Sequence, residues 1–383
     1  MFKRIFFALV VIITALGVFN YDNIRRLLAV NSLFAEDRIA DNFISMDSMF
    51  FSTPMELGPV RQPPLPEAET PLTMPPGFAE WAAERKVSAL VALRHGEVVY
   101  EEYFHGDAQD LRISWSVAKS FIATLFGISL ANGEIASLDD PVEKYAPKLI
   151  GSAYEGATIR NVLNMASGVE FDEDYHDFWS DINKMGRVLA FGGSLDDFAA
   201  AIETRIAPPG RQWQYVSIDT HVIGMVLRGA TGRTVPDLLA DRLLAPIGIQ
   251  KDPYYLTDGD GVAFVLGGLN LRTRDYARLG QLVLQNGMWN GVQVVPADWI
   301  AAMTTASAPT AEGASQYGYQ WWLPADARPG EVFGIGVYGQ YIWIDRAHDL
   351  VIAVNSANRS FSEDGVWEDN IEMFRKIGAA LTP

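Results

Sequence analysis

The 383-residue chain carries a net charge of −17 and contains no cysteine. Its length suits one large composite domain or two smaller ones, and its 49% hydrophobic residues are enough for a packed interior. The acidic balance argues against nucleic-acid binding, because phosphates would be repelled at long range. The lack of cysteine excludes disulfides, thiolate catalysis and cysteine-ligated zinc without naming a compartment.

Residues 1–25 are typical of a signal peptide or an N-terminal membrane anchor. A short basic start precedes residues 5–19, which are apolar and uncharged. This run is shorter than a comfortable membrane span but matches the core of an export signal. The small residues of "TALG" would allow cleavage, whereas Arg25 and Arg26 suit a retained anchor, and both alternatives stay open. We therefore expect an exported chain, either periplasmic or held in the inner membrane by an N-terminal segment that contacts the bilayer.

Residues 26–77 lack sustained periodicity, and their proline-rich part predicts an extended spacer. A compact domain is expected over residues 78–383. Its first signal is a hairpin over residues 87–104, where β-forming residues alternate around His95-Gly96. A helix then begins near Ser116 and ends at the cap pair Asn132-Gly133.

Helices and loops are predicted over about residues 146–261, and one more clear helix covers residues 273–287. Strands return over residues 317–323, 338–345 and 349–357, of which the last two form a hairpin, and a helix closes the chain. The predicted fold class is α+β, an α/β sandwich. One antiparallel sheet is built from the N- and C-terminal segments and flanked by helices, with a mostly helical subdomain inserted between them.

A serine and a lysine lie three residues apart where the apolar helix is predicted to begin. In "SWSVAKSFIATLFGISLANG", Ser116 and Lys119 would share one helix face. A serine hydroxyl needs a base to become a nucleophile, and burial would lower the pKa of Lys119 until a neutral amine could serve. The Ser116 N–H, near the positive end of the helix, could bind an oxyanion. The same spacing also suits a capping serine followed by a lysine that reaches solvent. The surrounding sequence is needed to choose between the catalytic and the structural interpretation.

The next stretch, "SLANGEIASLDDPVEKYAPKL", continues the helix into a polar cap, an acidic turn and another helix. With the Ser-x-x-Lys pair, this run resembles the serine β-lactamase and penicillin-binding-protein superfamily, in its class C and esterase-like branch. The chain is most similar to the 6-aminohexanoate-dimer hydrolases, from about Phe78 to the C-terminus. The resemblance implies a β-lactamase/transpeptidase-like fold and a hydrolytic serine.

The second box of this superfamily is a tyrosine followed two residues later by Asn or Ser. "WQYVSIDTHVIG" supplies Tyr215 and Ser217 at these positions. By resemblance, Tyr215 would relay a proton from Ser116 and return it to the leaving group, and Ser217 would contact the substrate. A half-buried tyrosine with a satisfied hydroxyl is the other interpretation, and the position in the box favours the catalytic one.

The third box usually holds Lys or His, then Thr or Ser, then Gly. Here "FGIGVYGQYIWID" places Gly334, Ile335 and Gly336 there, without a cation or hydroxyl. A β-lactam carboxylate would lose its usual donors. The resemblance implies that the Ile335 N–H completes an oxyanion hole with Ser116. The two glycines are expected to open the cleft for a longer or neutral substrate.

Three further positions match the dimer-hydrolase branch by resemblance. Tyr175, in "GVEFDEDYHDFWSD", would lie on a loop that closes over the substrate and hydrogen-bonds it. Of the pair Trp321 and Trp322, Trp322 would line the pocket, although large aromatics are often only packed. Leu266 stands where related enzymes can carry a polar amide, so recognition of an amide at this position is open.

The chain lacks a Gly-x-Ser-x-Gly elbow, and its five histidines show no metal-binding spacing. We expect no metal and no cofactor, and His221 is interpreted as a core or surface residue. The leading hypothesis is a serine hydrolase acting on small-molecule amides or esters through an acyl-enzyme. One alternative is a penicillin-binding DD-peptidase or β-lactamase, which the third box weakens. The other is a membrane-tethered binding module without turnover, which the Ser, Lys and Tyr set argues against.

Overall fold

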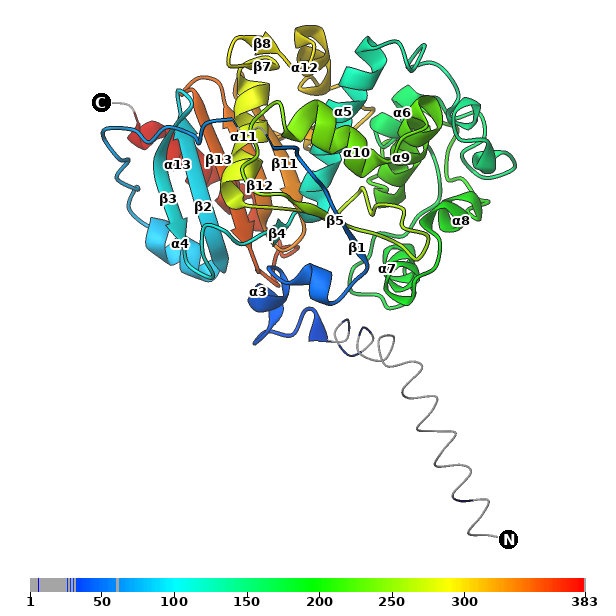
Figure 1. Ribbon diagram of the computed structural model, residues 1–383, viewed down its shortest axis with the longest axis horizontal. Helices are drawn as coiled ribbons and strands as arrows, with labels where there is room; N and C mark the ends of the chain where they lie inside the picture. Colours follow the sequence, from blue (N-terminus) through cyan, green and yellow to red (C-terminus); the bar gives the residue numbers. More distant parts are fainter. Residues whose placement is uncertain are drawn as a thin grey trace.

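The computed structural model describes residues 6, 26, 28, 30, 32–59 and 62–381 (Figure 1). The signal peptide or anchor predicted over residues 1–25 lies outside the described residues, apart from Phe6. Within the described ranges, no helix combines the length and the apolar character that a membrane crossing needs.

A seven-stranded antiparallel sheet forms the centre of the molecule, in the order β3-β2-β13-β12-β11-β10-β9. Its strands are β2 (Val87–Arg94), β3 (Glu97–Tyr103), β9 (Gln316–Gly318), β10 (Trp321–Leu323), β11 (Glu331–Gly336), β12 (Gln340–Asp345) and β13 (Leu350–Ser356). β2 pairs with β13, so the two ends of the domain meet in one sheet. The antiparallel α+β sheet expected from the sequence is therefore confirmed.

Both predicted hairpins are present. β2 and β3 are joined by His95 and Gly96, which have φ of +53° and +80°, as a two-residue turn between twisted strands requires. β12 and β13 pair in register from Asp345 opposite Leu350 to Tyr341 opposite Val354. The turn residues His95 and Gly96 thus account for the first reversal.

Helices cover both faces of this sheet (Figure 1). α11 (Thr273–Leu284) packs on one face, where a Cβ at Gly280 would lie 2.4 Å from Val351 Cγ1, so glycine permits the close approach. α4 (Phe78–Glu84) and α13 (Val366–Ala380) cover the other face. There the Phe374 ring lies 5.7 Å from Trp343 and 5.9 Å from Trp81.

The helical part of the molecule packs beside the sheet around α5 (Ala118–Ala131). The helices are α6 (Ile159–Leu163), α7 (Asp181–Phe191), α8 (Leu195–Ala200), α9 (Ser217–Thr231), α10 (Val235–Leu239) and α12 (Ala297–Met303). α5 is buried along nearly its whole length, because α9 and α10 pack against it and Gly334 of β11 approaches its Ser120. A short hairpin of β7 (Met288–Trp289) and β8 (Val292–Gln293) follows α11.

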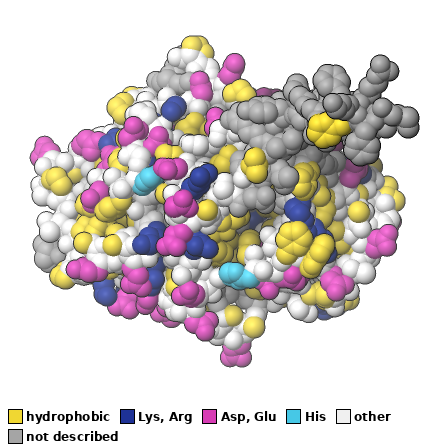
Figure 2. All heavy atoms as spheres, turned by 90° about the horizontal axis from the view of Figure 1, so that it is seen from below, with side chains coloured by type: hydrophobic (Ala, Val, Ile, Leu, Met, Phe, Trp, Pro, Cys, Tyr) yellow, Lys and Arg dark blue, Asp and Glu magenta, His cyan; other side chains and the backbone are white. Residues whose placement is uncertain are grey.

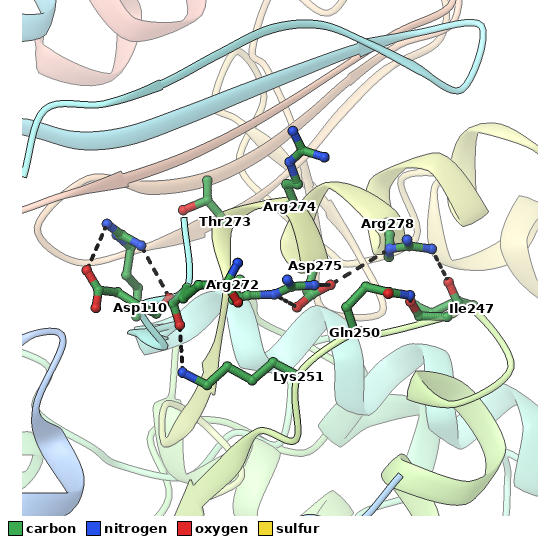
Figure 3. Close-up of polar contacts among 12 residues, drawn as sticks. Asp110, Ile247, Gln250, Lys251, Arg272, Thr273, Arg274, Asp275 and Arg278 are labelled. Carbon is green, nitrogen blue, oxygen red and sulfur yellow. Dashed lines mark hydrogen bonds and ion pairs between the residues drawn. The ribbon is translucent and has the colours of Figure 1, made fainter. Parts of the chain in front are cut away.

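A buried ion-pair network joins α11 to the helical part (Figure 3). The Arg272 guanidinium donates to both oxygens of the fully buried Asp275, at 2.8 and 3.0 Å. Arg278 lies 3.8 Å from the same carboxylate and donates to the carbonyl of Ile247 at 2.8 Å. The two arginines share one carboxylate, and Arg278 is also held by the backbone carbonyls of Ile247 and Pro63, so the network fixes the two parts together from the interior.

Residues 33–57 differ from the spacer expected over residues 26–77. This segment contains α3 (Ile39–Asn42) and β1 (Ser52–Pro54), and β1 enters a second sheet in the order β1-β5-β6-β4. The other strands of this sheet are β4 (Arg112–Ile113), β5 (Tyr254–Leu256) and β6 (Leu269–Leu271). Apolar side chains of the segment, among them Ile39, Phe43 and Met46, are buried in the core. These side chains fill gaps between other elements. Their positions in the sequence therefore show neither helical nor strand periodicity.

Candidate active site

Ser116 lies at the junction between the second sheet and the central helix. The Ser114 N–H donates to the carbonyl of Leu269 at 2.8 Å, which places the next residues over the start of α5. A single 3₁₀ turn, Trp115–Val117, connects β4 to α5. Trp115 has a φ of +41°, which is strained for a bulky residue. Such strain persists where the surroundings hold it, and it is common beside reactive groups.

Lys119 points directly at Ser116. Its Nζ donates to Ser116 Oγ at 2.7 Å, to Ser217 Oγ at 3.3 Å and to the carbonyl of Leu266 at 3.1 Å. The side chain is only 2% exposed. Burial lowers the pKa of Lys119 to about 7, against the opposing effect of the negative charge of Glu173. A neutral amine is therefore accessible at neutral pH within hydrogen-bond reach of the serine.

The phenol of Tyr215 completes this cluster from the other side. Tyr215 lies just before α9, and Lys119 Nζ is 5.2 Å from its ring centroid. Burial and the charge of Glu173 raise the pKa of Tyr215, while the hydroxyls of Ser116 and Ser217 act to lower it. The phenol is consequently protonated in the resting protein. This arrangement suits a proton donor better than a phenolate base.

Glu173 is the residue of this cluster that sequence reasoning missed. Its carboxylate accepts the Ser217 N–H, the Ser217 hydroxyl at 3.2 Å and the Tyr175 hydroxyl at 3.1 Å. Burial raises the pKa of Glu173, and the nearby Lys119 opposes this rise. The only sequence signal was its place in the acidic stretch that also carries Tyr175. Glu173 supplies the negative charge that faces the buried amine.

The third box lies on β11, beside Ser116. A Cβ at Gly336 would be 2.8 Å from the carbonyl oxygen of Ser114 and 3.0 Å from the Ser116 nitrogen. A Cβ at Gly334 would meet Ser120 Oγ at 2.9 Å. Both glycines therefore face the start of α5 and let β11 approach it. Gly334 does not open the cleft, contrary to expectation, and it is Ile335 and Gly336 that line a cavity beside Ser116.

Two cavities meet at Ser116. The smaller, of about 350 Å³, is lined by Tyr215, Trp322 and Trp367, among others. Trp322 lies 5.6 Å from the Tyr215 ring, whereas Trp321 is fully buried away from it. The larger cavity, of about 550 Å³, is lined by Ser217 and Leu266. The site thus has separate space on each side of the serine.

Tyr175 and His221 occupy different surroundings. Tyr175 lines both cavities, and its hydroxyl is engaged by Glu173. His221 is buried one turn into α9, and its Nε2 lies 2.7 Å from Asp196 Oδ1. Arg228 also donates to this carboxylate at 2.6 Å. His221 therefore belongs to a structural hydrogen-bonded cluster between α8 and α9, in which Arg228 and Asp196 form the ion pair.

Comparison with known proteins identifies the family. A family model described as Beta-lactamase matches residues 79–372. The chain belongs to the Beta-lactamase family. This is a hydrolase family.

The relatives that the chain resembles agree with this assignment. The 6-aminohexanoate-dimer hydrolase of Paenarthrobacter ureafaciens is 31% identical over 292 residues, which cover 72% of this chain and 74% of the relative. A structure from Bacillus anthracis, provisionally described as a 6-aminohexanoate-dimer hydrolase, superposes with a TM-score of 0.80 at 23% identity, covering 91% and 96% of the two chains. An octameric penicillin-binding protein homologue from Pyrococcus abyssi gives a TM-score of 0.61 at 20% identity, covering 78% and 76%. At these identities the two structures show the shared fold.

Proposed function

We propose that the chain is a serine hydrolase that cleaves linear amides or esters through an acyl-enzyme. The observation that carries the proposal is the 2.7 Å approach of the buried Lys119 amine to the Ser116 hydroxyl. A base with a pKa near the working pH is well matched to proton abstraction. The similarity to a 6-aminohexanoate-dimer hydrolase supports amides among the substrates.

In the proposed reaction, Ser116 Oγ attacks the carbonyl carbon while Lys119 takes its proton. The oxyanion that forms is bound by the backbone N–H groups of Ser116 and Ile335. Tyr215 gives its proton to the departing amine or alcohol as the carbonyl–leaving-group bond breaks, and it is reprotonated from Lys119. Water then attacks the acyl-enzyme and releases the acid. The position of Gly336 against the Ser116 nitrogen supports the approach of β11 that this oxyanion hole needs.

The test is burst acylation by a p-nitrophenyl ester. The wild-type protein is expected to release one equivalent of nitrophenol rapidly and to be labelled by a fluorophosphonate probe, and Ser116→Ala is expected to do neither. A folded Ser116→Ala protein that still acylates would refute the assignment. Labelling of Ser116 by a fluorescent penicillin would move the substrate class toward β-lactams, and absence of any labelling would favour a binding module.

We also propose that the chain is exported or anchored through residues 1–25. The basic start and the uncharged apolar run support this proposal. A reporter fused after this segment is expected to reach the periplasm, and a cytoplasmic reporter would contradict it.

A further inference from the structure

The larger cavity is an apolar groove that begins at the nucleophile. It runs from Ser116 between α7 and the N-terminal segment and has a volume of about 550 Å³. Its lining is mainly hydrophobic, and includes Phe34, Phe50, Trp115, Ile182, Leu189 and Phe264. The face seen in Figure 2 shows hydrophobic side chains gathered beside a hollow. Two exposed aromatics, Phe178 and Phe191, line the same groove. Exposed apolar surface of this kind commonly marks a site for an apolar ligand.

The described residues that line the groove offer no free charge to a polar substrate. Among the described residues that line it, Arg187 alone carries a fixed charge. Its guanidinium lies 4.1 Å from the centroid of the Phe178 ring and donates to the Phe178 carbonyl at 2.7 Å. This cation is therefore engaged at the rim. A hydrocarbon chain would meet complementary surface, whereas a carboxylate or an amine would lose its hydration without a partner.

The position of the proton donor tells which half of the substrate occupies the groove. Tyr215 lines the smaller cavity and does not line the groove, while Ser217 and Leu266 line the groove. Because the donor must reach the departing atom, the leaving group lies in the smaller cavity. The acyl part must then extend in the other direction. It follows the groove away from Ser116.

We propose that this groove binds a linear hydrocarbon acyl chain, so that the substrates are esters or amides of unbranched medium- or long-chain acids. The inference rests on the proposed function, and it names the substrate class of the same site. Ser116 Oγ would form a bond to the acyl carbonyl carbon, the alcohol or amine would depart with a proton from Tyr215, and water would release the fatty acid.

The N-terminal segment makes one wall of the groove. Leu33, Phe34 and Phe50 line it, and the Phe34 ring stacks on Tyr338 at 4.9 Å. Phe43 packs edge-on against Trp115, the residue before the nucleophile, at 5.5 Å. The segment is thereby held against the catalytic part of the molecule. It would set how long a chain the groove accepts.

The experiment measures kcat/KM for p-nitrophenyl acetate, butanoate, octanoate and dodecanoate, each below its micelle-forming concentration. All four share one leaving group, so only the acyl chain varies. Each buried methylene is expected to raise kcat/KM by about fourfold until the groove is filled. A flat or falling profile, with acetate still acylating Ser116, overturns the inference and leaves the proposed function intact. Failure of every ester to acylate the protein refutes the proposed function instead.

Two variants test whether the groove causes the dependence of kcat/KM on acyl-chain length. Gly186, in α7, lines the groove, and a Cβ there would meet no atom within 4 Å. Gly186→Trp is expected to lower the dodecanoate-to-acetate ratio at least tenfold. Ile150→Trp, at a 63% exposed position outside the groove, is expected to leave the ratio unchanged. An unaltered ratio in folded Gly186→Trp would overturn the assignment.

A second experiment distinguishes a soluble ester from a bilayer lipid as the source of the acyl chain. Monododecanoyl glycerol is offered in solution and within phosphatidylcholine vesicles. Cleavage in solution supports a soluble ester as the source, and cleavage only in vesicles supports a bilayer lipid. Cleavage in neither form, by a protein that hydrolyses p-nitrophenyl acetate, overturns the acyl-chain assignment.

Discussion

The Nζ of Lys119 lies 2.7 Å from the Oγ of Ser116 and also contacts Ser217 Oγ and the Leu266 carbonyl. All three partners are oxygens, and each can accept a hydrogen bond from the amine. The amine is therefore held toward the Ser116 hydroxyl. Its protonation state decides whether it can remove the serine proton.

The first prediction concerns pH. Burial lowers the pKa of Lys119 to about 7, and only the neutral amine can act as a base. The rate of acylation by p-nitrophenyl acetate should therefore rise with pH through about 7 and level off above it. Lys119→Met should lose this step in rate, with acylation reduced by about 10²–10⁴. Stopped-flow bursts over a range of buffers provide the measurement, and a rate independent of pH through this range would contradict the role of Lys119.

The second prediction concerns Glu173, a positioning residue beside the amine. Its negative charge raises the pKa of Lys119 against the effect of burial. In Glu173→Gln this contribution disappears, so the step in the acylation rate should move to lower pH. The shift in the profile distinguishes an electrostatic role from a purely structural one. Glu170→Gln, at an exposed position in the same stretch, is the matched control and should keep the wild-type profile. A wild-type profile in folded Glu173→Gln would contradict the role.

Local signals explain why much of the fold could be predicted. His95 and Gly96 take positive φ in a tight turn, and Asn132 and Gly133 end α5, as their chemistry predicts. Residues 33–57 could not be recognised in this way. Their apolar side chains fill gaps that exist only once β5 and α5 are in place, so they carry no period in the sequence.

The same reasoning applies to the site. Ser116 and Lys119 are one helical turn apart, so their contact follows from local geometry. Tyr215 is distant in the chain, and only the family resemblance places it near them. Glu173 was missed because neighbouring acids look alike in sequence, although Asp172 and Asp174 are exposed and Glu173 faces Lys119. Burial of one carboxylate among several is a tertiary property.

The third prediction tests the approach of β11. In Gly336→Ala, the added methyl would lie 2.8 Å from the Ser114 carbonyl oxygen and 3.0 Å from the Ser116 nitrogen, so the strand must move away. The single-turnover acylation rate should fall by about 10²–10³, the effect of losing one oxyanion donor. Gly334→Ala is the comparison, because its methyl would clash only with the rotatable Ser120 hydroxyl, at 2.9 Å, while Ser120 Cβ and Trp321 Cζ3 would lie at 3.6 and 4.0 Å. Gly334→Ala should lower the melting temperature, and its acylation rate should stay well above that of Gly336→Ala. Equal acylation rates in the two variants would contradict the proposed oxyanion hole.

The fourth prediction concerns the N-terminal segment. Among the described residues, eight hydrophobic side chains before Phe78 are buried, and β1 pairs with β5. Each such side chain contributes about 1.5–3 kcal/mol when fully buried, and a domain's total stability is only about 5–15 kcal/mol. A fragment beginning at Phe78 should therefore fail to fold cooperatively. A fragment beginning at Ser32 should melt at the same temperature as the full chain, because it keeps all eight side chains. Thermal unfolding by circular dichroism compares the two, and a Phe78 fragment that melts with the Ser32 fragment would show that the segment is dispensable for stability.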